Sequence, residues 1–224
     1  MAGLAASGFD SLRERDAGAA AGALPAGAFE LASWAFFASH VPITLLVDGQ
    51  AVLPRALFAW GPRRALEWFL EWSRDPLMRV ATASPAPPAT AWFRAIVCAE
   101  LALQVPFFAV ALAALTGTFD ERAAPPGRGL SSPAWLRTAA VAYGAHVATT
   151  MIPILAQIAL FEERNFTERH RVALVAVYLP YLIMPLLVLW RAAAVSAAGG
   201  GQLFRTGAAA PRGAKAAAAV LHYD

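Results

Sequence analysis

Residues 172–190 read VALVAVYLPYLIMPLLVLW, and none of these side chains carries a charge. A helix needs about 20 apolar residues to cross the hydrocarbon core of a bilayer, which is about 30 Å thick. Three further apolar segments of similar length lie at residues 31–53, 95–116 and 138–161. They contain two acids, Asp48 and Glu100, and no Lys or Arg. The sequence therefore predicts four transmembrane helices.

The composition agrees with a protein that lies in lipid. Of the 224 residues, 58% are hydrophobic and only 15% are charged, whereas a soluble domain has about 25% charged residues. The net charge of +3 is small and dispersed, which argues against a nucleic-acid partner. A single cysteine, Cys98, excludes an intrachain disulfide. No metal-binding spacing, cofactor loop or catalytic triad is recognisable, so we expect no metal and no cofactor.

Prolines inside the apolar segments indicate bent helices. Five of them fall there: Pro42, Pro106, Pro153, Pro180 and Pro185. In water such residues break helices, but in a membrane bundle neighbouring helices can satisfy the freed carbonyl groups. We therefore expect an all-α membrane protein, a four-transmembrane-helix bundle with proline-kinked helices and an interior ligand pocket. Kinks without a cavity are the alternative.

The remaining chain divides simply. Residues 1–29 and 192–224 are rich in alanine and glycine, and we predict flexible extensions on either side of a membrane domain at 30–191. The loop at 54–91 contains ALEWFLEWSRDPLM, whose apolar spacing predicts a short helix at the membrane interface. The two sides of the membrane would carry equal numbers of Lys and Arg, so charge does not predict the orientation.

The first span contains two ionisable side chains, His40 and Asp48, within an apolar segment. A charge in the bilayer interior is costly, so one that persists there usually faces a cavity or a partner. Asp48 follows His40 by eight residues, which places them about 12 Å apart along the helix and about 80° apart around it. They can border one cavity without touching. Alternatively, Asp48 is a helix-end carboxylate in interfacial water, and His40 is a hydrogen-bonded structural group.

The other spans offer further polar groups. Glu100 and Gln104 are four residues apart and share one helix face, although Glu100 is also close enough to the helix start to reach water. The third span carries Thr149 and Thr150, and the fourth carries Tyr178 and Tyr181, which could equally be packing residues. Two carboxylates among aromatic side chains predict an apolar pocket with an anionic spot. Such a pocket suits an apolar cation, or a molecule such as a sterol whose reaction develops positive charge.

Five blocks of the sequence resemble the sigma-2 receptor branch of the EXPERA family, which is related to the emopamil-binding sterol isomerase. The blocks are SHVPITLLVDGQAVLPRALF (39–58), RDPLM (74–78), AWFRAIVCAELALQVPFF (91–108), AHVATTMIPILAQIALFEE (145–163) and VAVYLPYLIMPLLVLW (175–190). The resemblance covers roughly residues 31–191 and implies a multi-pass protein of the endoplasmic reticulum membrane, with cytosolic termini and a lipid-accessible pocket. The chain ends AVLHYD and lacks the family's lysine-rich tail.

The resemblance also implies roles for individual residues. The residue matching Asp48 pairs with the ammonium group of a ligand, Asp75 holds that first aspartate, and Glu100 belongs to the same polar cluster. The matched threonine is Thr150 or its neighbour Thr149, and the matched tyrosine is Tyr181. The implied partners are a sterol or hydrophobic amine, the lipid bilayer, a second copy in a homodimer and a sterol-trafficking membrane protein.

Three functions compete. A receptor or binding protein for sterols and lipophilic amines, acting in sterol (cholesterol) homeostasis, is the leading interpretation, with no catalytic residues. The first alternative is a sterol Δ8-Δ7 isomerase, which needs an acid and a base to move a double bond. The isomerase relatives carry a carboxylate where this chain has Thr44, which argues against that activity. The second alternative is a membrane scaffold that binds partners through its loops and does not need Asp48.

Overall fold

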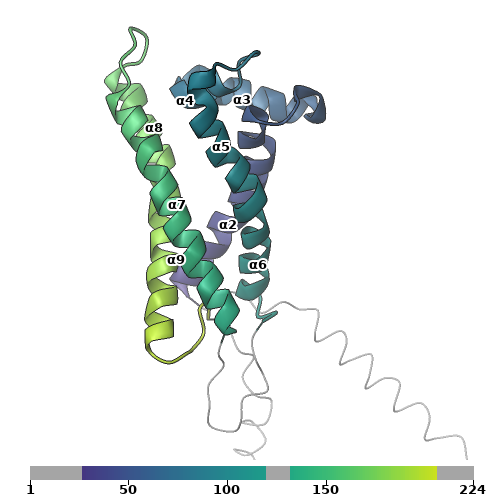
Figure 1. The fold of residues 1–224 in the computed structure, drawn as a ribbon, viewed down its shortest axis with the longest axis vertical. Coiled ribbons are helices and arrows are strands. Elements are labelled where there is room, and N and C mark those ends of the chain that lie inside the picture. The colour runs from purple at the N-terminus through teal and green to yellow at the C-terminus, as the bar shows by residue number, and fades with distance from the viewer. Residues whose placement is uncertain (1–26, 120–131, 206–224) are drawn as a thin grey trace, which may run out of the picture.

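A computed structural model describes residues 27–119 and 132–205, and every regular element within these ranges is helical (Figure 1). The elements follow in the order α2 (Ala28–Leu46), the 3₁₀ turn η1 (Asp48–Ala51), η2 (Arg55–Leu57), α3 (Trp60–Ser73), α4 (Pro76–Ala81), η3 (Pro88–Thr90), α5 (Ala91–Ala99), the π-helical turn η4 (Glu100–Gln104), α6 (Val105–Leu115), α7 (Ala134–Leu160), α8 (Glu168–Tyr178) and α9 (Pro180–Ala197). Most of the predicted N-terminal extension, residues 1–26, and the predicted tail beyond residue 205 lie outside the described residues.

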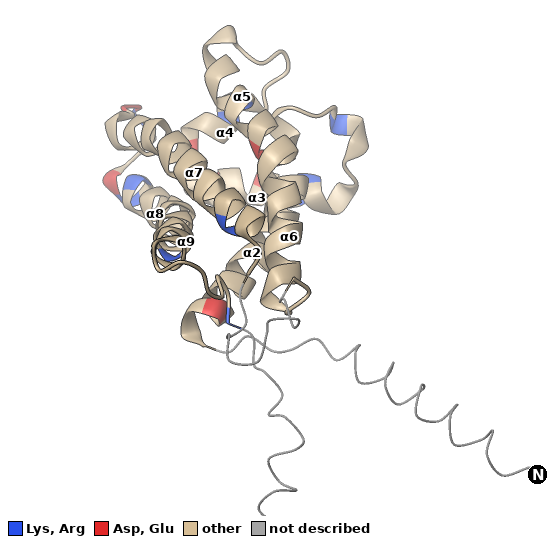
Figure 2. Ribbon diagram, turned by 60° about the horizontal axis from the view of Figure 1, so that its bottom comes forward, with Lys and Arg blue, Asp and Glu red and all other residues tan. Residues whose placement is uncertain are grey.

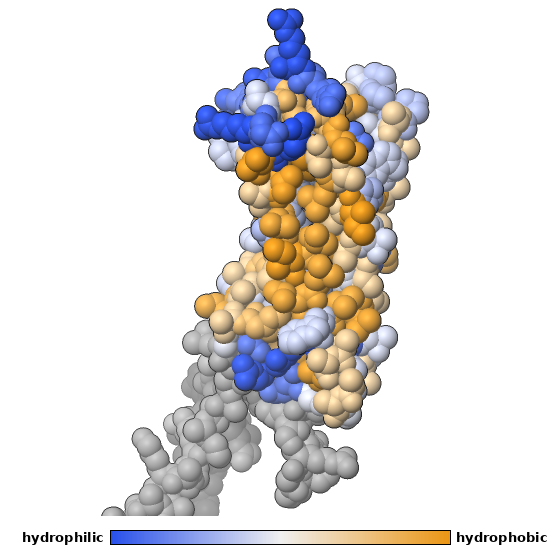
Figure 3. Space-filling view, turned by 90° about the vertical axis from the view of Figure 1, so that its left-hand side faces the viewer, coloured by the Kyte–Doolittle hydropathy of each residue, from blue (hydrophilic) through white to orange (hydrophobic). Residues whose placement is uncertain are grey.

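Four helical stretches of the described chain are long and apolar enough to cross a membrane, as predicted. They are Ala28–Ala51, Pro88–Leu115, Ala134–Leu160 and Glu168–Ala197. Figure 3 shows the outer face of the bundle as a hydrophobic band between two polar ends. A band of this kind is what a lipid-facing surface requires, because hydrocarbon cannot solvate charges. The chain is therefore a multi-pass membrane protein in a lipid bilayer.

Each of these spans contains a proline, and two of the spans are divided into separate α-helices. Pro42, Pro153 and Pro185 lie inside α2, α7 and α9, and Pro180 begins α9 just after α8 ends. In the second span the π-helical turn η4 ends two residues before Pro106, whose missing N–H cannot continue the ladder. Single π turns occur frequently at functional sites. A proline thus lies within the helices or at a helix junction of each of the four spans, while the kinks themselves stay a prediction.

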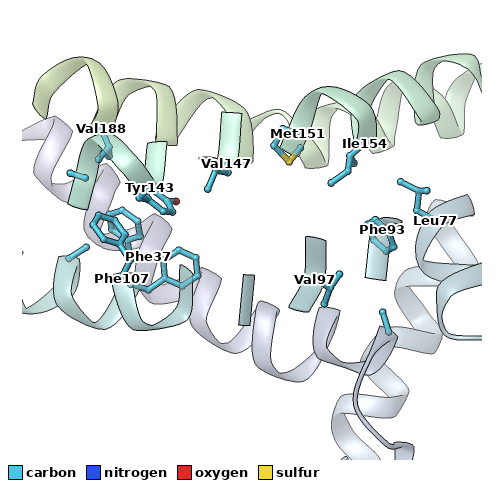
Figure 4. Close-up of a cluster of buried hydrophobic side chains, with 14 of the residues drawn as sticks. Phe37, Leu77, Phe93, Val97, Phe107, Tyr143, Val147, Met151, Ile154 and Val188 are labelled. Carbon is cyan, nitrogen blue, oxygen red and sulfur yellow. The ribbon is translucent and has the colours of Figure 1, made fainter. Parts of the chain in front are cut away.

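The bundle consists of two pairs of helices. α7 packs against α9, and α2 packs against α6, while α3 and α4 lie together at one end (Figure 1). Gly144 permits the close contact of the first pair, because a Cβ at this position would lie 2.6 Å from the Pro185 carbonyl oxygen. The pairs meet in an aromatic cluster in which Phe37 of α2 packs on Phe107 of α6 and Tyr143 of α7 (Figure 4).

The segment between the first two spans contains the predicted short helix and a second one. α3 is amphipathic, with Leu66 buried and Trp68 exposed, as an interfacial helix requires. The helix ends at Ser73, and the next residue, Arg74, has a φ of 55° that turns the chain. α4 begins two residues later, at Pro76. Asp75 caps α4, and a proline follows at the first helical position, where its missing N–H costs nothing.

The predicted start of the flexible C-terminal tail at residue 192 is wrong for residues 192–205. α9 continues to Ala197, and the side chains of Leu203 and Phe204 are fully buried. The glycine- and alanine-rich composition of this segment did not indicate the contact, because the two large side chains that become buried are a single Leu-Phe pair. At the other end, α2 begins at Ala28, slightly before the predicted span.

Candidate functional site

A pocket of about 350 Å³ lies inside the bundle between the helix pairs and beneath α3. This volume is at the lower end of the range for small-molecule sites. All four spans and α3 contribute side chains, and most of these side chains are apolar. The polar lining residues are His40, Asp48, Glu100, Gln104, Thr150, Tyr178 and Tyr181.

The close-up in Figure 4 shows how the apolar walls lie. Met151 and Ile154 of α7 face Phe93 and Val97 of α5 across the pocket. The aromatic cluster around Phe37 lies beyond the lining residues His40 and Val147, and Phe108 stacks on His40. We call this cluster, which supports that end of the pocket without lining it, the pocket floor: Phe37, Phe107, Phe108 and Tyr143. A ligand in this space would be surrounded by hydrocarbon on most of its surface.

Glu100 is held in place by two groups of the first span. The Thr44 hydroxyl donates to Glu100 Oε1 over 2.8 Å, and His40 Nε2 lies 3.1 Å from the same oxygen. His40 is itself fixed by rings, with Phe108 stacked at 4.6 Å and Tyr181 edge-on at 4.6 Å between centroids. Glu100 is the first residue of the π-helical turn η4. The carboxylate that α2 binds therefore lies where the second span departs from regular α-helical geometry. Charged groups inside a membrane require such partners.

Asp48 differs from Glu100 in its contacts. It begins η1 at the end of α2, is partly buried and lines the pocket. Within the described residues its carboxylate makes no hydrogen bond and no ion pair. The other acid of the first span, Glu30, has such contacts, and Glu100 of the second span is bound by His40 and Thr44. Asp48 is therefore the pocket carboxylate available to a bound molecule. Figure 2 marks the acidic positions along the ribbon in red.

Asp75 does not line the pocket. Its side chain is fully buried, and Oδ1 accepts from the backbone N–H groups of Leu77 and Met78 over 2.8 and 3.0 Å. Oδ2 accepts from the Tyr178 hydroxyl over 2.6 Å. Burial raises the pKa of Asp75, while the hydrogen bonds from Tyr178, Met78 and Leu77 and the Arg79 guanidinium lower it in part. Asp75 thus orients a tyrosine of the pocket wall, and within the described residues it makes no hydrogen bond to Asp48, the residue that the resemblance implied it would hold.

The structure separates the two candidate threonines. Thr150 lines the pocket, whereas Thr149 is exposed and its hydroxyl donates to the Ala145 carbonyl, so of the two alternatives only Thr150 borders this pocket. Consecutive residues of a helix point about 100° apart, which is why only one of the two can face inward. Gln104 lines the pocket, is buried and makes no side-chain hydrogen bond within the described part of the chain.

Sequence reasoning missed several lining residues. Trp68, Phe69 and Trp72 of α3 form the wall at the α3 end of the pocket, although Trp68 and Trp72 were assigned only to the membrane interface. The signal was present in the amphipathic spacing of α3, but the spacing does not say which surface the helix covers. Thr44 was also missed as a partner of Glu100. No group of three His, Cys, Asp or Glu side chains within residues 27–119 and 132–205 could hold a metal ion.

Fold and site together define a multi-pass helical membrane protein with an apolar, acid-lined pocket inside its bundle. The sequence pattern of the family described as EBP, or EXPERA (EXPanded EBP superfamily), matches residues 63–192. The chain belongs to the EXPERA family, as its sequence blocks predicted.

Two relatives illustrate the similarity. Sigma intracellular receptor 2 of Homo sapiens is 38% identical over 165 residues, which cover 69% of this chain and 81% of the relative. Sigma intracellular receptor 2 of Xenopus tropicalis is 38% identical over 169 residues, covering 71% of this chain and 86% of the relative.

Proposed function

We propose that this protein is an intracellular membrane receptor for sterols and lipophilic amines. The single observation that carries the proposal is Asp48, a carboxylate that borders an apolar pocket and has no partner among the described residues. An ammonium group on an apolar molecule would supply that partner. A neutral sterol would fill the same space through apolar contact alone.

The physics of such a site favours molecules that combine both properties. Removing apolar surface from water contributes about 25 cal/mol per Å². An unpaired ammonium in an apolar pocket would be strongly disfavoured, but Asp48 offsets this cost. Gln104 and Thr150 add hydrogen-bonding groups on the second and third spans, so a ligand oxygen could be recognised away from the cation.

A binding screen with purified protein tests this proposal. Native mass spectrometry or radioligand binding would compare hydrophobic tertiary amines, sterols, and soluble amines without an apolar body. We expect the first two classes to bind and the third to fail. Equal binding of all three classes, or of none, would contradict the proposal.

A matched pair of variants tests the pocket itself. Thr150→Val removes a hydroxyl that lines the pocket, whereas Thr149→Val makes the same change on the exposed face. For ligands with a hydrogen-bonding oxygen we expect Thr150→Val to lower affinity about threefold to tenfold, because a net hydrogen bond contributes about 0.5–1.5 kcal/mol. Thr149→Val should bind normally. The reverse order of effects would place the ligand outside this pocket.

A sterol isomerase is the second candidate, and one contact favours it. His40 and Glu100 lie 3.1 Å apart at the pocket, an arrangement in which a proton could be exchanged between a base and an acid. Thr44 occupies the position where isomerase relatives carry a carboxylate, and its hydroxyl cannot replace that group as a proton donor and acceptor at neutral pH. Rescue of growth in yeast that lacks its own sterol isomerase would overturn our preference for a receptor.

The proposed cellular setting is the endoplasmic reticulum membrane, in cholesterol homeostasis or trafficking, with a homodimer and a sterol-trafficking membrane protein as partners. A pure scaffold would act without ligand. Loss of cholesterol-dependent phenotypes in cells expressing Asp48→Asn would support the receptor, whereas full function of that variant would support the scaffold.

A further inference from the structure

The chain reverses direction after α9 and returns to the bundle. Gly199, Gly200 and Gly201 have φ angles of 81°, 129° and 140°. Residues with a Cβ rarely adopt such positive φ angles, so the three glycines permit a reversal of the chain that alanines would not. We call residues 201–205, which follow this turn, the C-terminal clasp.

The clasp buries two apolar side chains at the end of the bundle away from α3. Leu203 is 0% exposed and Phe204 is 1% exposed. The ring of Phe204 stacks on Phe29 at the start of α2, with 6.1 Å between centroids and 18° between planes. The Leu203 N–H donates to the hydroxyl of Ser132, just before α7, over 2.9 Å.

The clasp also pairs a buried carboxylate with two arginines that reach the surface. Glu30, in the first turn of α2, is 0% exposed, and its Oε1 accepts from the backbone N–H of Arg205 over 3.0 Å. The Arg205 guanidinium lies 3.5 Å and the Arg191 guanidinium 3.9 Å from the same oxygen. Arg191 further donates to the Leu203 carbonyl over 3.3 Å. A buried carboxylate needs this compensation, so the clasp and Glu30 depend on each other.

The clasp and the pocket floor share one face of α2. The buried residues of α2 are Glu30, Ser33, Phe37, His40 and Thr44, which form a single stripe along the helix. Phe37 belongs to the pocket floor and lies two turns beyond Glu30, since seven residues span about 10 Å of helix. The clasp and the pocket floor therefore both pack on the same buried stripe of α2.

We propose that the C-terminal clasp is a conformational device that holds the first two turns of α2 against α9 and the start of α7, and thereby keeps the pocket floor closed. The device is intramolecular, because its two halves come from the beginning and the end of the described chain. Its release would loosen α2 from residue 28 toward residue 40 before the rest of the bundle. This inference concerns the fold, and only its consequence for ligand retention rests on the proposed function.

Two variants of the full-length chain in lipid nanodiscs test the clasp. Phe204→Ala removes the stacked ring, and Glu30→Gln removes the buried charge at nearly constant volume. The matched control is Glu67→Gln, because Glu67 pairs with Arg55 and Arg64 at exposed positions where such pairs contribute little. Hydrogen–deuterium exchange followed by mass spectrometry measures residues 28–40, and thermal unfolding measures the whole protein.

We expect amides in residues 28–40 to exchange about tenfold faster in Phe204→Ala and Glu30→Gln, because local opening precedes global unfolding. The melting temperature should fall by about 6 °C or more in Phe204→Ala. The double variant should lose less than the sum of the two single losses, since each variant alone already loosens the same clasp. Exchange equal to that of Glu67→Gln, or a uniform increase in all four spans, would overturn the proposal.

Ligand dissociation gives a second, separable result. If the pocket binds a lipophilic amine, dissociation from Phe204→Ala should be several-fold faster than from Glu67→Gln. Unchanged dissociation despite faster exchange of α2 would overturn the link between clasp and floor. Absence of amine binding to the parent chain would contradict the proposed function but leave the exchange experiment decisive for the clasp.

Discussion

Replacing Asp48 by asparagine removes one charge and keeps the volume of the side chain. In the pocket Asp48 has no hydrogen bond or ion pair within the described chain, so the substitution leaves no protein group there without its partner. The fold should therefore tolerate Asp48→Asn. Only a cationic ligand loses an interaction, because its ammonium group would then be buried without a counter-charge.

The magnitude follows from the burial of the site. Removing one partner of a buried charge pair costs about 2–5 kcal/mol. Asp48 is only partly buried, and Glu100 remains nearby, although His40 and Thr44 already occupy its Oε1. We therefore expect the lower value, about 2 kcal/mol, which corresponds to a roughly 30-fold weaker affinity for a tertiary amine.

Competition binding with purified protein measures this change, with a neutral sterol as the internal control. Asp48→Asn should bind the sterol within about threefold of the parent chain, since apolar contact dominates that interaction. The reasoning is refuted if the amine binds Asp48→Asn as well as it binds the parent. It is equally refuted if sterol and amine lose affinity by the same factor, because the loss would then reflect a damaged pocket.

Two further predictions concern contacts that hold the pocket walls. Tyr178→Phe leaves one oxygen of the buried Asp75 without its donor, which should destabilise the protein by about 1–3 kcal/mol in thermal unfolding; an unchanged melting temperature would mean that water replaces the hydroxyl. Gly144→Ala brings a Cβ to 2.6 Å from backbone and side-chain atoms of α9, so it should cost about 1–3 kcal/mol, whereas Gly61→Ala meets nothing within 4 Å and should not destabilise. Equal effects of the two alanine variants would contradict the close packing of α7 on α9.

Much of the fold was predictable because lipid imposes a strict rule on sequence. Backbone and charged groups cannot be solvated in hydrocarbon, so a span must be helical, long and nearly free of charge. Residues 172–190 meet that rule without reference to any other part of the chain. The Asp75-Pro76 pair likewise indicates the start of a helix from local geometry alone.

Local sequence patterns do not predict which residues of different helices contact one another. Helical spacing put Glu100 and Gln104 on one face, but it could not say that His40 and Thr44 would hold Glu100 from another helix. Nor could it separate Thr150 from Thr149, since both positions are equally compatible with a helix and only the rotation of α7 in the bundle distinguishes them.

The sequence by itself determined the four apolar spans of the described chain, the prolines inside them and the acids that enter the apolar layer. Each of these properties depends on a single helix and its solvent. Only the tertiary structure decided that Asp75 meets Tyr178, 103 residues away, and that Phe204 returns to Phe29. Those contacts depend on the relative rotation and height of several helices, which side-chain packing sets and which no short stretch of sequence encodes.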